Sequence, residues 1–265
     1  MVETHYKISN APHLVLLADL HGRPFQTVID SLRRHKPDLI CIVGDIIYGT
    51  HPENDRSPLD TQENVLPFLK ACAGLAPSFL SLGNHEWMLD EEDLQRIRDC
   101  GITVLDNDFK VITINGSQIV IGGLTSAYCL VYRRFLRGLT ADGRAERRYP
   151  KKECGGNENL TPNIEWLKEF AAEKGWHILL SHHPEYWPLI APHSIELCLS
   201  AHAHGGQWRI FNHGVFAPGQ GFWPSLTSGV HNGRLVISRG LSNTAKVPRL
   251  FNPPEIVYIE GQIQR

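Results

Sequence analysis

Short runs of apolar residues recur along this chain, and several of them end in a polar segment of a similar kind. Five such segments occur, in the order Asp19-Leu20-His21, Gly44-Asp45, Gly83-Asn84-His85-Glu86, His182-His183-Pro184 and His202-Ala203-His204. Four of the five directly follow an apolar run rich in β-branched residues, which is typical of a strand buried on both faces. The sequence therefore predicts that side chains able to bind metal ions lie at the ends of buried strands.

The first hundred residues alternate between two hydrophobic periodicities. Continuous apolar runs predict strands at residues 14–18, 39–43 and 78–82. Apolar residues at helical spacing predict helices at residues 25–34, 64–73 and 90–99, with Pro24 suited to the first helical turn. Strands that alternate with helices in this way form parallel sheets whose faces the helices cover.

The second half of the chain is richer in strands. Residues 102–105, 110–114 and 118–121 are expected to add antiparallel strands, because Asn115-Gly116 is a strong signal for a type I′ hairpin. A helix is expected from Thr161 as N-cap, with Pro162 behind it. Further strands are predicted at residues 177–180, 197–200, 208–211, 235–237 and 256–259.

This order of elements fits an α/β fold of two mixed sheets packed face to face with helices outside, a four-layer α/β/β/α sandwich. We expect one domain over residues 1–265, because a chain of 265 residues that is 42% hydrophobic can bury one large core. The net charge of −2 argues against a surface adapted as a whole to nucleic acid or acidic lipid.

Cysteine usage and apolar content bear on the cellular compartment. The six cysteines show no CxxC spacing and are expected to be reduced and structural. The N-terminal residues lack an apolar core of signal-peptide length, and no stretch approaches the roughly 20 apolar residues of a transmembrane segment. A cytoplasmic location is the resulting expectation.

The side chains that follow the predicted strands suggest a metal-assisted hydrolase. Asp19, Asp45, Asn84 and His182 each come one to three residues after a strand, where ligands collect in open α/β sheets. Carboxylate, amide and imidazole donors suit Mn, Fe, Co or Zn better than Ca or Cu(I). Two such cations about 3.5–4 Å apart can hold a bridging hydroxide in line with a phosphorus atom, so phosphate-ester hydrolysis is the expected chemistry.

The five motifs, taken in order, resemble those of the calcineurin-like metallophosphoesterase superfamily over Asp19 to His204. The resemblance implies the metallophosphoesterase fold, a phosphate-ester substrate and two divalent metal ions (Mn, Fe, Zn or Co). It implies that one metal is bound by Asp19, His21 and His204, the other by Asn84, His182 and His202, and both by Asp45. It also implies that His85 binds no metal and faces the substrate phosphate, as the catalytic electrophile or acid.

Two further comparisons refine this resemblance. Ala201 stands where the superfamily usually has glycine, which is the smallest change available there. Residues 205–207, 238–241 and 252–256 resemble the tail of the YkuE/YaeI-like bacterial phosphoesterases, which implies phosphodiesters rather than monoesters. The Ser/Thr protein phosphatases of the superfamily carry an arginine just before Gly-Asn-His-Glu and an Asp-Arg-Gly after Gly-Asp. This chain has Leu82 and residues 46–49 at those positions, so a phosphoprotein phosphatase is not expected.

Single residues of these motifs also have structural explanations. Asp45 alone fits a turn residue, and His21 or His182 alone fits a core histidine with one hydrogen bond. Their joint order and their placement at strand ends favour a metal site. His183 is expected to be structural, since neighbours on an extended backbone point to opposite sides. Glu86 is expected to support the ligands or to carry charge at a helix N-terminus.

A basic segment, residues 131–158, interrupts the second half. Between Val131 and Lys152 eight basic and two acidic side chains give a local charge of +6. The segment is either a solvated loop or a mobile flap that clamps a polyanion, with nucleic acid or anionic lipid bound through residues 133–152. The aromatic loop at residues 219–224 is either a packed turn or a substrate lid. Arg239 is a candidate for substrate binding, with a structural salt bridge as the alternative.

Three other functions stay open from the sequence. A nuclease of the same superfamily would be supported by the basic segment alone. An inactive scaffold with the same fold should have lost ligands, whereas every ligand position here carries a suitable side chain. A structural zinc site would favour cysteine ligands, and no cysteine lies in the five motifs. The oligomeric state is not predicted.

Overall fold

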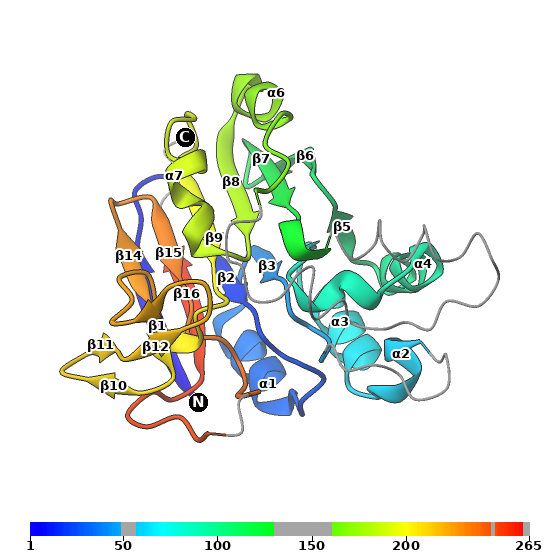
Figure 1. The fold of residues 1–265 in the computed structure, drawn as a ribbon. Helices are drawn as coiled ribbons and strands as arrows, with labels where there is room; N and C mark the ends of the chain where they lie inside the picture. The colour runs from blue at the N-terminus through cyan, green and yellow to red at the C-terminus, as the bar shows by residue number, and fades with distance from the viewer. Residues whose placement is uncertain (49–56, 130–160, 245–246, 262–265) are drawn as a thin grey trace, which may run out of the picture.

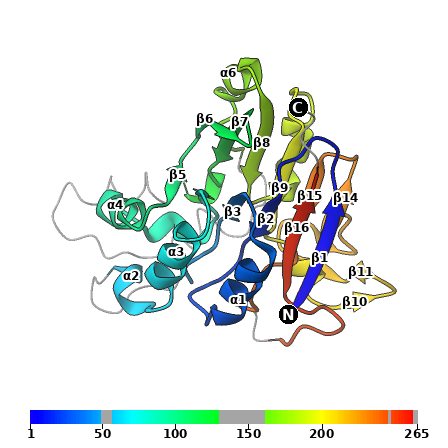
Figure 2. The ribbon, with the colours of Figure 1, turned by 180° about the vertical axis from the view of Figure 1, so that it is seen from behind.

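The structure is a computed structural model, and it describes residues 1–48, 57–129, 161–244 and 247–261. Two six-stranded sheets form its centre, and helices lie outside them (Figures 1 and 2). The layers are helices, sheet, sheet and helices, which confirms the predicted four-layer sandwich of mixed sheets. The basic segment 131–158 lies outside the described residues.

The first sheet has the strand order β1-β16-β2-β3-β4-β5. Its strands are β1 (Val2–Lys7), β2 (Leu14–Leu17), β3 (Leu39–Val43), β4 (Ser78–Ser81), β5 (Thr103–Leu105) and β16 (Glu255–Glu260). Strands β2 to β5 pair in parallel, as the sequence predicts. Strand β16 lies antiparallel to β2 and parallel to β1, so the two ends of the described chain share this sheet.

The second sheet has the strand order β14-β15-β9-β8-β7-β6. Its strands are β6 (Asp108–Ile114), β7 (Ser117–Leu124), β8 (Trp176–Ser181), β9 (Leu197–Ser200), β14 (Gly229–His231) and β15 (Leu235–Ile237). The predicted hairpin joins β6 and β7, and Asn115 and Gly116 have φ of 49° and 82°, as a type I′ turn requires. Strands β7, β8, β9 and β15 pair in parallel.

The helices cover the outer faces of both sheets. Beside the first sheet lie α1 (Gln26–His35), α2 (Pro58–Thr61), α3 (Val65–Ala73) and α4 (Glu91–Asp99), and beside the second lie α6 (Leu167–Ala172) and α7 (Trp187–Ile190). Short 3-10 helices occur at η1 (His85–Met88), η3 (Pro184–Tyr186) and η4 (His204–Gly206). Two small hairpins pair β10 (Arg209–Ile210) with β11 (His213–Gly214) and β12 (Phe216–Ala217) with β13 (Gly221–Phe222).

Three groups of buried side chains hold the layers together. Leu16 and Leu180 belong to the group between the two sheets, Phe68 to the group under α1, α3 and α4, and Phe170 to the group under α6 and α7. The described cysteines all carry free thiols, and all but Cys100 are buried. No helix in the described part of the chain has both the length and the apolar character needed to cross a membrane.

Three local expectations are wrong in detail. Of the residues 102–105, Thr103–Leu105 form β5, which pairs in parallel with β4 in the first sheet and takes no part in the antiparallel hairpin. The extended run at 208–211 is limited to β10 in a separate hairpin, because Phe211 adopts a left-handed φ of 46°. Helix α1 begins at Gln26, so Pro24 precedes its first turn. The strand expected at residues 256–259 is confirmed as β16, which lies in the first sheet.

The helix expected from Thr161 begins only at Leu167. The carboxamide of Asn163 accepts a hydrogen bond from the backbone N–H of Glu165, and the Trp166 indole donates to the carbonyl of Asn163. These contacts form a local turn that competes with the first helical turn.

Candidate metal centre

The polar segments that follow β2, β3, β4, β8 and β9 converge at one edge of the two sheets. Three groups of side chains offer ligand atoms within 4.8 Å of one another: Asp19, His21 and His204; His21, Asp45 and His85; and Asp45, His182 and His202. Asn84 lines the same cavity as Asp45, His202 and His204. The structure thus brings all seven predicted metal ligands and His85 together, and their roles stay predictions.

Asp19 and Asp45 are the acidic centres of this cluster, and both are fully buried. Oδ1 of Asp19 lies 3.7 Å from Nε2 of His21 and 3.5 Å from Nε2 of His204. Oδ2 of Asp45 lies 3.1 Å from Nε2 of His182 and 4.0 Å from Nε2 of His21. Asp45 therefore contacts histidines from both predicted ligand sets.

Five of the predicted ligands have left-handed backbone conformations. The φ angles are 56° at Asp19, 50° at His21, 55° at Asp45, 61° at His202 and 46° at His204. Non-glycine residues adopt such angles at an energetic cost, and they cluster where the surrounding structure holds a functional group in place. Here the left-handed turns follow β2, β3 and β9, and the side chains of these five residues belong to the cluster.

One series of backbone hydrogen bonds joins the first two turns. The backbone N–H of Asp19 donates to Gly44, that of His21 donates to Asp45, and that of Gly22 donates to Ile46. The segments after β2 and β3 are therefore joined beyond the end of the sheet. This pairing fixes the spacing of the Asp19 and Asp45 backbones.

The imidazoles of His21 and His182 are oriented by backbone carbonyls. Nδ1 of His21 contacts the carbonyl oxygen of Ile47 at 3.1 Å, and Nδ1 of His182 contacts that of Val43 at 2.7 Å. A neutral ring that donates from Nδ1 leaves a lone pair on Nε2, the atom that faces the carboxylates. Ligand histidines in metalloproteins are commonly held in this way.

Several polar atoms at the centre lack a hydrogen-bond partner in the part of the chain that the structure describes. They are both carboxylate oxygens of Asp19, Nε2 of His21 and Oδ1 of Asn84. Buried polar atoms are normally paired, because an unpaired one costs about 1–3 kcal/mol. The carboxylate, amide and imidazole donors fit divalent Mn, Fe, Co or Zn, so this cluster suits a pair of metal ions.

The charges of the cluster are strongly coupled. Burial disfavours the ionised carboxylates, but nearby histidines outweigh it and lower the pKa of Asp19 and of Asp45. Burial also disfavours a charged His182, yet Asp45 and Asp19 outweigh it and raise the pKa of His182 to about 10. Two buried carboxylates thus require compensating positive charge, which a bound cation would also provide.

His85 stands at the edge of this cluster and lines the cavity. Its Nε2 lies 3.8 Å from Oδ2 of Asp45, and its backbone N–H donates to Oδ1 of Asp45 at 2.9 Å. Burial lowers the pKa of His85 to about 4. The side chain keeps 25% exposure, so it can meet a ligand in the cavity while Asp45 holds its backbone.

Glu86 has the supporting position that the sequence predicts. Its fully buried carboxylate accepts hydrogen bonds from the backbone N–H groups of Gly83, Asp45 and Ile46, each at 2.8 Å. Burial, together with the charge of Asp45, raises the pKa of Glu86 to about 7. Glu86 therefore joins the segments after β3 and β4.

His183 packs behind the predicted ligands. Its ring centroid lies 4.0 Å from that of His202, and its Nε2 contacts Oγ of Ser126 at 2.9 Å. Burial lowers the pKa of His183 to about 3, so the ring is neutral. Ala201 is buried beside this region, and its N–H donates to the carbonyl of His182 without needing a left-handed φ.

Arg239 does not line the cavity. Its guanidinium contacts Oε1 of Glu255 at 2.8 Å, and its backbone N–H donates to Oε2 of the same carboxylate. Of the two alternatives for Arg239, the structure shows the salt bridge. The buried Glu255 therefore fixes the chain just before Gly240.

Gly240 and Arg249 were not predicted to belong to the centre. A Cβ atom on Gly240 would lie 2.4 Å from Oδ2 of Asp19, and Gly240 has a left-handed φ of 77°. Arg249 donates a 2.8 Å hydrogen bond to Nδ1 of His204, and burial lowers the pKa of Arg249 to about 10. That bond places the proton of neutral His204 on Nε2, so metal binding through Nε2 requires Arg249 to rearrange.

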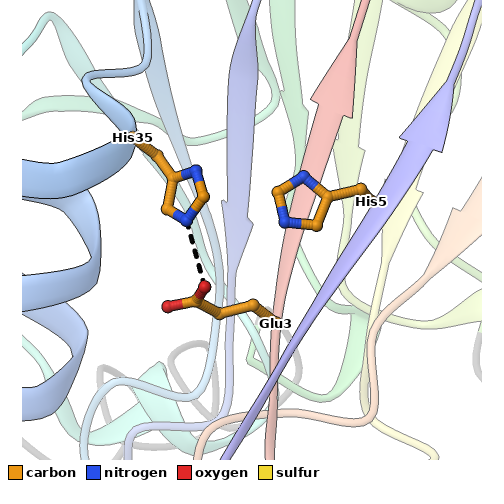
Figure 3. A group of neighbouring side chains, drawn as sticks. All are labelled: Glu3, His5 and His35. Atoms are coloured by element: carbon orange, nitrogen blue, oxygen red, sulfur yellow. Dashed lines mark hydrogen bonds and ion pairs between the residues drawn. The ribbon is translucent and has the colours of Figure 1, made fainter.

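A fourth group of possible ligand types, Glu3, His5 and His35, lies away from this centre (Figure 3). Oε2 of Glu3 contacts Nε2 of His35 at 3.0 Å, while Oε1 accepts hydrogen bonds from Ser31 and Arg34. Glu3 is thus the hub of a polar network that joins β1 to α1. We assign it a structural role.

Known proteins are similar to this chain in sequence. The family model for calcineurin-like phosphoesterases matches residues 12–206. A Caenorhabditis elegans protein named as a metallophosphoesterase is 27% identical over 93% of this chain, and the chain spans only 47% of its length. Phosphodiesterase YaeI of Escherichia coli is 26% identical over 77% of this chain and 65% of its own.

A solved dimetal phosphatase from Danio rerio superposes with a TM-score of 0.49 at 14% identity, covering 87% of this chain and 88% of its own. The family match includes all five motifs and most of both sheets. This chain therefore belongs to the calcineurin-like phosphoesterase family.

Proposed function

We propose that this protein hydrolyses phosphodiesters, in preference to phosphate monoesters, at a dinuclear metal centre within one domain of residues 1–265. The observation that carries the proposal is the position of Asp45, whose carboxylate contacts histidines of both ligand sets. In this assignment Asp19, His21 and His204 bind one metal ion, and Asn84, His182 and His202 bind the other. Asp45 is their common ligand.

Two divalent cations in these positions would supply a nucleophile derived from water near neutral pH and would neutralise charge on the phosphoryl oxygens. The protein positions them through strained strand-end turns and through the carbonyls behind His21 and His182. The metals are Mn, Fe, Zn or Co by the chemistry of the donors.

His85 is the residue proposed to contact the substrate. Its ring reaches the cavity from η1, and Asp45 and Glu86 hold the surrounding backbone. A neutral imidazole can donate a hydrogen bond from one ring nitrogen to a phosphoryl or leaving-group oxygen. Such a donor stabilises charge that develops during bond cleavage.

The preference for diesters is supported by the similarity to phosphodiesterase YaeI. The nuclease alternative depends on residues 133–152, which the structure does not describe. The inactive-scaffold alternative is disfavoured because every ligand position is occupied by a suitable side chain and the centre retains unpaired donor atoms.

The decisive experiment combines metal analysis with turnover. The purified protein is assayed for metal content and for hydrolysis of bis-p-nitrophenyl phosphate and p-nitrophenyl phosphate, with and without added Mn²⁺. Two bound metals and faster cleavage of the diester would support the proposal. Absence of metal and of turnover with Mn²⁺, Fe²⁺, Zn²⁺ or Co²⁺ would overturn it and favour the scaffold alternative.

A further inference from the structure

A cavity of about 610 Å³ opens beside the metal centre, and its lining includes both polar and apolar side chains. Asp45, His85 and His204 of the centre belong to the lining. Five large apolar side chains also line it, and we call them the apolar wall: Trp208, Val215, Phe216, Phe222 and Val247. A phosphate bound at the metal centre would therefore have an apolar wall next to its ester groups.

The apolar wall continues onto the outer surface. Trp208 is 41% exposed, Phe216 44% and Phe222 77%. Soluble proteins expose single apolar side chains often, but a continuous group of them around a cavity marks a binding surface. Phe216 and Phe222 lie in the β12–β13 hairpin, and Trp208 and Val215 flank the β10–β11 hairpin. Both hairpins lie outside the main sheets (Figure 1).

Three exposed aromatic residues around this wall have left-handed backbones. Phe211, at the turn between β10 and β11, is fully exposed with φ of 46°. Phe251 is 88% exposed with φ of 53°, and Trp223 is 60% exposed with φ of 54°. Glycine or asparagine would relieve this strain, so strain and exposure together point to a function for aromatic side chains here.

The segment with Phe251 is joined to the β10–β11 hairpin. The Trp208 indole donates to the carbonyl of Pro248 at 2.9 Å, and the backbone N–H of Arg209 donates to Leu250 at 3.0 Å. The backbone N–H of Trp223 donates to Val215, which belongs to the cavity wall. The exposed aromatic residues and the wall therefore form one surface, which we call the aromatic rim: Trp208, Phe211, Phe216, Phe222, Trp223 and Phe251.

The wall fits hydrocarbon better than a nucleobase. Phe216 and Phe222 meet edge to face, with centroids 5.4 Å apart and an angle of 65°, so they do not form a parallel slot for a stacked base. The carboxamide N–H of Gln207 already donates to Asn243 and Val247. An acyl chain needs no such polar partner, and aromatic side chains are favoured at the interface of a lipid bilayer.

We propose that the substrate is a phospholipid held in a bilayer, and that the aromatic rim attaches the protein to that bilayer. This inference rests on the proposed phosphodiesterase function. The lipid phosphate would lie at the metal centre, with the glyceride part along Val215 and Val247. Water would add to phosphorus and one P–O ester bond would break, with the proton passing to the released alcohol.

The attachment is tested without turnover. Metal-free protein is mixed with vesicles of phosphatidylcholine, which carry no net charge, and floated on a density gradient. The protein is expected to float with the vesicles. The double variant Phe211→Ser/Phe251→Ser should bind at least tenfold more weakly, whereas Leu75→Ser, an exposed apolar residue after α3, should bind like the parent. Circular dichroism verifies that each variant is folded.

Turnover then separates this inference from the proposed function. The metal-loaded protein is assayed on phosphatidylcholine vesicles and on soluble bis-p-nitrophenyl phosphate. The ratio of lipid to soluble turnover should fall at least tenfold in the double variant. Cleavage of the soluble diester without flotation or lipid cleavage would overturn the inference and leave the proposed function standing. Flotation without cleavage of either ester would instead overturn the proposed function and the lipid substrate.

Discussion

The buried carboxylate of Glu86 accepts a 2.8 Å hydrogen bond from the backbone N–H of Asp45. Because the same carboxylate also accepts bonds from Gly83 and Ile46, it connects the turns after β3 and β4. The position of Asp45 thus depends on Glu86, which is not itself a proposed metal ligand.

Glu86→Gln should weaken metal binding without removing a proposed ligand. The new amide places a donor where backbone N–H groups need an acceptor, which costs about 1.5–3 kcal/mol of stability. Loss of such a supporting contact typically lowers metal affinity about 10–100-fold. Titration with Mn²⁺ and thermal unfolding measure the two effects. Glu92→Gln, at an exposed position of α4, is the control, and equal behaviour of the two variants would refute the supporting role.

Gly240→Ala should displace Asp19. A Cβ atom at position 240 would lie 2.4 Å from Oδ2 of Asp19, so one of the two must move. Gly233→Ala is a matched control, because Gly233 has a similar φ of 66° but no atom near the added methyl group. Both variants pay about 1–2 kcal/mol for a left-handed alanine. Only Gly240→Ala should also lose metal, as measured by metal analysis after dialysis.

Asp45→Asn should abolish metal loading at the centre. The amide keeps the shape of Asp45 but removes the negative charge that both ligand sets share. Turnover of bis-p-nitrophenyl phosphate should then fall by roughly 10³-fold or more, since the metal-assisted steps are lost. Retention of two metals with full turnover would contradict the assignment of Asp45 as the common ligand.

His85→Ala should separate catalysis from metal binding. The ring contacts the cavity and is not assigned to a metal, so the metal content should match that of the parent. Loss of one preorganised donor to a developing charge typically lowers turnover about 10²–10³-fold. Full activity on several esters, or metal lost together with activity, would show that the role given to His85 is wrong.

Four of the proposed ligands could be located from the sequence because each lies one to three residues beyond a buried strand. Asp19, Asp45 and Asn84 follow strands of the first sheet and His182 follows β8 of the second, so hydrophobic periodicity placed each of them at a strand end. Parallel strands with helical crossovers put their carboxyl ends on the same side of a sheet. The local hydrophobic pattern therefore predicts that residues far apart in the sequence lie close together.

The missed contacts depend on long-range placement. Strand β16 joins the first sheet between β1 and β2, and no local periodicity identifies those partners. Gly240 and Arg249 reach Asp19 and His204 only because the chain before β16 passes over the centre. The left-handed turn at Phe211 also runs against residue preference, so the end of β10 could not be read from the sequence.

The pH dependence of stability should expose the network around Glu3 (Figure 3). The hydrogen bond from Ser31, with further contributions from His35 and Arg34, outweighs burial and lowers the pKa of Glu3 from 4.5 to about 2. The folded state therefore binds fewer protons at Glu3 than the unfolded state between these pH values. The stabilisation from Glu3 is fully present above pH 4.5 and is lost as the pH falls toward 2.

Glu3→Gln should consequently lower the Tm of the metal-free protein at pH 6, and this difference should shrink as the pH approaches 3. Metal-free protein is used because acid also releases ions from the centre. Thermal unfolding followed by circular dichroism at several pH values gives both curves, with Glu92→Gln as a surface control. A Tm difference that stays constant over this range would show that the ionised carboxylate of Glu3 does not stabilise the joint between β1 and α1.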